Sequence, residues 1–354
     1  CRTDFDMENL FHYSADSLGT CGHPRWLAAV DVRALRRHPL RPTDHEPRSH
    51  DALRKAVAAA RYQFSPAYAS TVAMLRTQFI AVAIDQAYQR RQKDAEGEFY
   101  RTIAGQGPRN NFNSTTQGFY IATAAGKLLL YNNNRDPEKL HRLMQQHLQS
   151  FQAPSAATPI SSGTLDARYN PSPPEGGCVV RVQARVLRGY PPTTDRWKKI
   201  FQSSLSRDNL WISAAEQQAL TNGQVMQSLQ HRIARFHLVD NTRGEPPMWK
   251  NEEIRQLTIT LEGTTLRGMV HLETADGKRG YQAELMGKLE VRGGKVVRFD
   301  MVADGNFWGH GPYTGNAPEG RFPFAVGFRL ADGTDAADRV PPQGSRGWVQ
   351  GYIR

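Results

Sequence analysis

Regular alternation of apolar and polar residues dominates the last hundred residues of the chain. Apolar residues occupy about every second position in five segments, 257–261, 266–272, 281–291, 297–301 and 324–330. A period of two sends successive side chains to opposite faces of a β-strand, so each segment is typical of a strand with one apolar face. The pattern predicts an antiparallel meander that either curls over helices or closes into a small β-barrel.

Helical and extended segments precede this meander. Residues 179–187 alternate like a strand, and residues 194–205, 213–220 and 224–236 have helical character. In the last of these, one face carries Met226, Leu229, Ile233 and Phe236. Residues 177–354 therefore predict a domain of helices plus an antiparallel sheet, and the chain as a whole an α+β fold.

A second series of elements occupies residues 79–151. An apolar strand at 79–85 precedes a short helix at 96–103, and two strands follow, turning at Ala125-Gly126. Asp136 is positioned to cap a final helix. Its apolar stripe, spaced at i, i+3, i+4, i+7, i+8 and i+11, consists of Leu140, Leu143, Met144, His147, Leu148 and Phe151. Such a stripe predicts a helix that packs on a sheet.

Composition divides the rest of the chain. Residues 1–50 are rich in Arg, Pro and His and predict an extended arm, with one short helix or strand near Trp26. Residues 153–176 contain many Pro, Ser and Gly and are typical of a linker. We therefore predict an arm (1–50), a first domain (51–152), a linker (153–176) and a second domain (177–354).

The first domain resembles the thioredoxin superfamily. The resemblance is carried by residues 75–85 (LRTQFIAVAID), residues 116–127 (TQGFYIATAAGK) and the closing helix. It implies a thioredoxin-like α/β fold. It also implies a nucleophilic cysteine at the start of the helix before the first of these strands, and a cis-proline before the later strand. Here those places hold Phe-Ser-Pro-Ala (64–67) and Thr116-Gln117. The chain therefore resembles a redox scaffold that lacks both the nucleophilic cysteine and the cis-proline.

The net charge and the composition indicate which kinds of partner the protein can bind. The 354 residues carry a formal net charge of +11, which favours anionic partners such as an acidic protein subunit, an anionic surface or a glycan. The Arg residues are dispersed and match no nucleic-acid-binding motif, so we expect no specific nucleic-acid partner. No apolar run reaches 18 residues, which predicts no transmembrane segment. No P-loop or dinucleotide fingerprint occurs, and we expect no cofactor.

The three cysteines, Cys1, Cys21 and Cys178, suggest export. Cys1 fits the lipid-modified first residue of a bacterial lipoprotein, and a Cys1–Cys21 disulfide is an alternative that also needs an oxidising compartment. Both predict an exported protein, in the periplasm or at the cell surface, that is lipid-anchored in the first case.

Cys21 is also a candidate for catalysis, because His23 follows it by two residues in a Gly-flanked segment. A structural thiol is the alternative. Five histidines crowd into the arm and could meet at a metal, but solvated or hydrogen-bonded surface side chains are the favoured explanation, and we expect no metal site. These are His12, His23, His38, His45 and His50.

Two further segments carry candidate chemistry. Residues 304–313 place Phe307, Trp308, His310 and Tyr313 among glycines, which predicts a ligand-binding loop or a packed plug. Residues 236–245 contain a His-Asp pair that could act as a general base, but a hydrogen-bonded turn between helix and sheet is favoured.

Three functions follow from these patterns. The preferred one is a non-catalytic accessory or scaffold subunit of an extracytoplasmic assembly. The alternatives are a thiol-dependent oxidoreductase using Cys21 and a ligand- or glycan-binding module in the C-terminal sheet.

Overall fold

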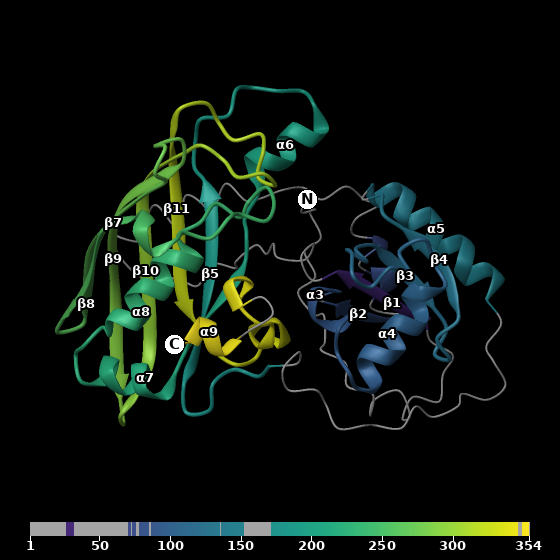
Figure 1. The fold of residues 1–354 in the computed structure, drawn as a ribbon, viewed down its shortest axis with the longest axis horizontal. Helices are drawn as coiled ribbons and strands as arrows, with labels where there is room; N and C mark the ends of the chain where they lie inside the picture. Colours follow the sequence, from purple (N-terminus) through teal and green to yellow (C-terminus); the bar gives the residue numbers. More distant parts are fainter. Residues whose placement is uncertain are drawn as a thin grey trace.

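The protein contains two β-sheets with helices packed on them, an α+β fold (Figure 1). The computed structural model describes residues 26–31, 70–71, 73–75, 78–84, 86–134, 136–151, 171–345 and 349–353. The predicted catalytic pair Cys21 and His23, the lipidation or disulfide candidate Cys1, and the arm histidines lie outside the described residues. So does most of the predicted linker.

The larger sheet has seven strands, and every neighbouring pair is antiparallel. In sheet order the strands are β6 (Asp208–Ile212), β5 (Cys178–Val186), β11 (Arg321–Leu330), β10 (Lys295–Trp308), β9 (Gly280–Arg292), β8 (Thr265–Glu273) and β7 (Ile254–Glu262). The predicted five-strand meander is confirmed. The small closed barrel is wrong, because in the described chain the sheet curls only into a half-barrel, with β6 and β7 at its edges.

Glycines on the concave side of the strands allow this curl. A Cβ atom on Gly268 would lie 2.1 Å from the carbonyl oxygen of Thr258, and one on Gly287 would lie 2.2 Å from that of Asp300. Only a residue without a side chain permits such close approach of neighbouring backbones. The sheet therefore bends where the sequence supplies glycine at inward-facing positions.

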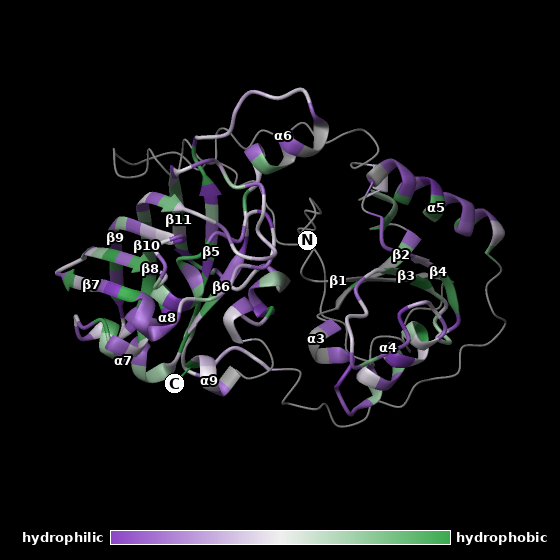
Figure 2. Ribbon diagram, turned by 45° about the horizontal axis from the view of Figure 1, so that its top comes forward, coloured by the Kyte–Doolittle hydropathy of each residue, from purple (hydrophilic) through white to green (hydrophobic). Residues whose placement is uncertain are grey.

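Helices fill the concave face and form the main core with it (Figure 1). They are α7 (Ala214–Thr221), α8 (Gln227–Arg232), the single π-helical turn η4 (Ile233–His237) and α9 (Val349–Ile353). Ser213 caps α7 through a capping box with Glu216. Of the predicted apolar helix face, Leu229 and Ile233 are fully buried against the sheet, whereas Phe236 is partly buried and Met226, at the start of α8, is 39% exposed. Figure 2 shows the alternating apolar and polar positions along the strands. We call the opposite, helix-free side the outer face.

The smaller sheet has four strands in the order β2-β1-β3-β4. β2 (Phe79–Ile84) runs parallel to β1 (Trp26–Asp31), whereas β3 (Phe119–Ala122) runs antiparallel to β1 and forms a hairpin with β4 (Leu128–Asn132). The predicted hairpin is confirmed, and Gly126 turns it with a φ of +79°. β1 lies in the segment predicted as an extended arm, so part of that arm contributes one of the two internal strands of the sheet.

Helices pack on both faces of this sheet. α5 (Pro137–Ser150), capped by Asp136 as predicted, buries Leu140 and Met144 against Phe119 and Ile121. α4 (Ala95–Gly105) buries Tyr100 and Ile103 on the other face, which carries Tyr120 and Ala122. α3 (Gln86–Gln89) follows β2 directly. All four residues of β3 are buried, because it is covered on both sides.

Four short elements accompany the larger sheet. α6 (Arg196–Ser203) confirms the predicted first helix of the C-terminal domain. The short turns η5 (Asn251–Glu253), η6 (Ala336–Arg339) and η7 (Gln343–Ser345) connect or follow the strands. β6 was not foreseen from the sequence, because its residues include Asp208 and Asn209 and do not alternate.

Candidate binding groove

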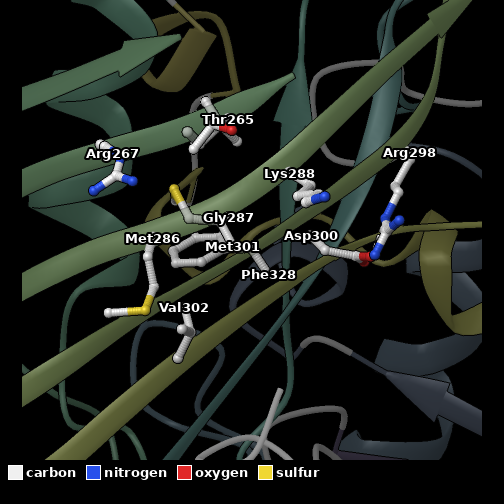
Figure 3. A pocket seen from close by; sticks show the side chains of 11 residues that line it. Thr265, Arg267, Met286, Gly287, Lys288, Arg298, Asp300, Met301, Val302 and Phe328 are labelled. Carbon is white, nitrogen blue, oxygen red and sulfur yellow. Dashed lines mark hydrogen bonds and ion pairs between the residues drawn. The ribbon is translucent and has the colours of Figure 1, made fainter. Parts of the chain in front are cut away.

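A groove of about 370 Å³ crosses strands β8, β9 and β10 on the outer face (Figure 3). The antiparallel register places its side chains in two rows. Thr265, Lys288 and Asp300 stand side by side in one row. Arg267, Met286 and Val302 form the next, two residues farther along each strand. Because side chains alternate along a strand, all six project from the same face of the sheet.

Some charged side chains in the groove form ion pairs and others do not. Arg298 holds Asp300 with its Nε atom 2.7 Å from Oδ2, and also reaches Glu290 at 3.0 Å. These hydrogen bonds raise the pKa of Arg298 and lower that of Glu290. Lys288 stands directly opposite Asp300, whose carboxylate is already engaged by Arg298.

Two cationic side chains of the groove, Arg267 and Lys288, are consequently not neutralised by a carboxylate of the described residues. Within the described part of the chain, neither Arg267 nor Lys288 has a carboxylate at ion-pair distance, and both side chains are exposed. The side chains that line the groove therefore present net positive charge to solvent.

The floor of the groove is apolar. Val302 is only 6% exposed, whereas Met286 is 38% exposed and covers one side of the floor. Met269, in the row beyond Arg267 and Met286, is 47% exposed on the same face. An apolar floor beside cations without ion-pair partners suits a ligand that has both an apolar part and an anionic end. The apolar part can lie on the floor while the anionic end contacts Arg267 or Lys288.

The residues predicted to bind a ligand do not converge. Phe307 and Trp308 belong to β10, not to a loop, because this strand continues to Trp308. Being adjacent on a strand, they face opposite ways. Phe307 is buried among the core aromatics, and Trp308 lies on the outer face with the Arg321 guanidinium 3.8 Å above its ring. Only His310 and Tyr313 lie in the following loop.

The His-Asp pair predicted in residues 236–245 is also arranged differently. Asp240 accepts hydrogen bonds from the backbone and hydroxyl of Thr242 and pairs with Arg243 at 2.5 Å, which confirms the hydrogen-bonded turn. His237 instead contacts Asp208 and Tyr352, far away in sequence.

The contact between His237 and Tyr352 lies inside the core. The Nε2 atom of His237 is 2.5 Å from the Tyr352 hydroxyl, and its Nδ1 atom is 3.4 Å from Oδ2 of Asp208. Each of the three residues is at most 3% exposed. Burial raises the pKa of Tyr352 well above its ordinary value. A group of this kind resembles a catalytic relay in composition, but its burial keeps solutes away, so we assign it to packing.

A second polar cluster lies at the smaller sheet. It is centred on Thr116, which is fully buried. Its backbone N–H donates to Oε1 of Gln86 at 3.1 Å, and its carbonyl oxygen accepts from the Tyr120 hydroxyl at 2.6 Å. Its side-chain hydroxyl lies 2.6 Å from the hydroxyl of Tyr100. Every polar group of Thr116 is thus engaged within the protein.

Cys178 is the free cysteine of the described chain, at the start of β5. Burial, and secondarily the charge of Glu216, raises the pKa of its thiol to about 12. A thiol with so high a pKa is a poor nucleophile at neutral pH.

The described ranges contain neither a cluster of metal ligands nor a helix suited to span a membrane. No three His, Cys, Asp or Glu side chains gather there as metal ligands. None of the helices described combines the length and the apolar character needed to span a bilayer.

Sequence reasoning missed the groove because its residues come from three strands. The available signal was the presence of Arg267, Met286 and Lys288 at the polar positions of alternating segments, where methionine is unusual. Which residues stand side by side depends on register, and no local pattern gives the register. No protein-family model, curated protein or solved structure matches this chain, so its role has to be inferred from its own residues.

Proposed function

We propose that the protein is a non-catalytic accessory or scaffold subunit whose smaller sheet is a degenerate thioredoxin-like domain. The order of elements supports this. The thioredoxin fold places a parallel strand before the series of strands and helices that the sequence resembles, and β1 occupies that place beside β2. The hairpin β3–β4 and helix α5 complete the same order.

The state of Thr116 is the observation that carries the proposal. In the thioredoxin superfamily the segment before this strand holds the substrate thiol, and the resemblance assigns that position to Thr116-Gln117. Here the N–H, carbonyl and hydroxyl groups of Thr116 are satisfied by Gln86, Tyr120 and Tyr100. Opening this cluster to receive a substrate would leave several buried polar groups without partners, which is unfavourable. The arrangement supports a closed, structural role for this segment.

The positions of the cysteines support the same interpretation. The resemblance places the reactive cysteine after the first strand and before the second. Residues 32–78, between β1 and β2, contain no cysteine, and Cys21 precedes β1 in the sequence. Cys178 belongs to the other sheet.

An insulin-reduction assay with the full chain tests the proposal against the alternative of a thiol-dependent oxidoreductase. We expect the rate of insulin precipitation with dithiothreitol to be the same with and without the protein. A matched variant, Cys21→Ser, should behave identically. A clear acceleration that disappears in this variant would overturn the proposal and favour catalysis by Cys21.

Alkylation provides a second readout. We expect iodoacetamide to modify Cys21 at pH 6 no faster than it modifies a model thiol, because a catalytic cysteine would have a lowered pKa. Rapid modification at this pH would contradict a non-catalytic role.

A further inference from the structure

The groove on the outer face differs from the rest of that face in being both hollow and unevenly charged. Its volume of about 370 Å³ falls in the lower part of the range of small-molecule sites, roughly 300–1,000 Å³. It is formed by strand residues in an antiparallel register and not by a loop, so its walls are held in place by the sheet.

The charge pattern favours an anion. Among the described residues, Asp300 is the one carboxylate that lines the groove, and it is paired at 2.7 Å with Arg298, whose guanidinium Glu290 shares. Arg267, on β8, stands directly opposite Met286, and Lys288 follows Met286 by two residues along β9, so the two cations are diagonal neighbours. Two exposed cations in diagonal positions next to one methionine can approach a single anionic group together.

The floor favours an apolar body attached to that anion. Val302 is almost completely covered, and the thioether of Met286 is flexible enough to adapt to a guest. The two groups lie side by side across β9 and β10. A purely inorganic anion would leave this apolar surface unused.

We propose that this groove binds a small amphiphilic anion, with its apolar body on Met286 and Val302 and its anionic head between Arg267 and Lys288. The ligand class is a short-chain or medium-chain organic acid, or a sulfate or phosphate ester of similar shape. The site is independent of the thioredoxin-like sheet, and it lies apart from the aromatic segment 304–313.

Isothermal titration of the full chain with decanoate, below its micelle concentration, tests the proposal. We expect saturable binding of one decanoate per chain. Decyltrimethylammonium, with the same chain and the opposite charge, should not bind to this site. Inorganic phosphate should compete poorly because it lacks the apolar body.

Variants locate the site. The double variant Arg267→Gln/Lys288→Gln should weaken decanoate binding three- to tenfold. A matched control, Arg255→Gln/Lys278→Gln, removes the same charges from exposed positions outside the groove and should leave binding unchanged. Met286→Asp, which puts a carboxylate on the floor, should abolish binding. Circular dichroism and thermal melts verify that each variant is folded.

Four outcomes would overturn the proposal: no saturable decanoate binding, equal weakening in the control variant, equal binding of the cationic analogue, or full competition by phosphate. Vesicles of phosphatidylglycerol and phosphatidylcholine separate a free ligand from a lipid surface. Binding to such vesicles without binding of monomeric decanoate would show a membrane-surface patch and reject the groove. Because the assay involves no thiol, its result is separate from that of insulin reduction.

Discussion

Arg232 and Glu216 form a two-point ion pair in the core of the larger unit. The guanidinium Nη1 and Nη2 atoms lie 2.6 and 2.9 Å from the two carboxylate oxygens, and both side chains are at most 2% exposed. Arg232 also donates to the backbone carbonyl of Tyr352 at 2.7 Å. The pair therefore joins α7 and α8 to the C-terminal helix α9.

Removing the charge of Glu216 should destabilise the fold strongly. Glu216→Gln leaves the Arg232 guanidinium buried without a counter-ion, a change that typically costs about 3–5 kcal/mol. Urea-induced unfolding followed by tryptophan fluorescence measures it, because Trp211 and Trp249 are buried in the same core. The control Glu252→Gln, at an exposed site, should change stability by less than about 0.5 kcal/mol. Equal effects of both variants would argue against a structural role of the pair.

The same pair should make stability depend on acid. Burial raises the pKa of Glu216, but its hydrogen bonds from Arg232, Ser213 and Ser228 outweigh this, so the pKa lies below its ordinary value. A lowered pKa contributes stability that is complete above the unfolded pKa, about 4.3, and is lost as pH falls through the folded pKa. We expect this contribution to decline below about pH 5. Urea midpoints from pH 7 to pH 3 should fall more steeply in the natural protein than in Glu216→Gln.

The buried contact of His237 with Tyr352 can be tested by removing one hydroxyl. Tyr352→Phe leaves Nε2 of His237 without its partner at 2.5 Å, and an unsatisfied buried group typically costs about 1–3 kcal/mol. Tyr313→Phe is the control, since Tyr313 is 67% exposed. Thermal melts of the two variants should differ clearly. If they coincide, the hydroxyl does not stabilise the docking of α9.

Thr116 should be essential to the smaller sheet. Thr116→Val preserves shape but removes the hydroxyl that lies 2.6 Å from that of Tyr100, and we expect a loss of about 1–3 kcal/mol. Hydrogen exchange of the β3 amides reports this sheet separately from the larger one. The neighbouring, exposed Thr115→Val should leave exchange almost unchanged. Normal protection of β3 in Thr116→Val would remove the main support for a closed substrate position.

Gly280 gives a steric prediction on the outer face. A Cβ atom at this position would lie 2.1 Å from the Trp308 ring, whose Nε1 atom donates to the carbonyl of Gly277 at 3.0 Å. Gly280→Ala should displace the indole at a cost of about 1–3 kcal/mol. Gly315→Ala, where nothing lies within 4 Å, is the matched control. The urea midpoints of these two variants decide whether Trp308 packs against the strand.

Cys178 should be slow to alkylate in the folded protein. Its thiol pKa of about 12 leaves very little thiolate at pH 8, and the residue is half-buried. Iodoacetamide labelling followed by peptide mass spectrometry should show little modification of Cys178 until urea is added. Rapid labelling without urea would contradict the burial of this thiol.

Local sequence patterns were sufficient to predict most of the helices and strands. Alternation predicted the five strands of the meander, and the spacing from Leu140 to Phe151 predicted a helix packed on a sheet, because side-chain direction repeats with a fixed period. Asp136 marked a helix start through backbone hydrogen bonds that depend only on near neighbours.

Local sequence patterns failed to predict the elements whose conformation depends on contacts with residues distant in the chain. β6 contains Asp208 and Asn209, whose side chains form hydrogen bonds with residues more than 120 positions away, such as Val340 and Gln343. β10 continues through Gly305 to Trp308 because β9 and β11 pair with it on both sides. Nothing local distinguishes such a strand from a glycine-rich loop.

The sequence by itself determined most of the helices and strands and their apolar faces, since these follow from periodicity and capping over a few residues. Tertiary structure alone decided that β1 joins the smaller sheet, that the larger sheet stays open, and that Arg267, Met286 and Lys288 meet across two strands. The reason is physical: strand register and sheet order are set by contacts between residues distant in the chain, and these have no local signature.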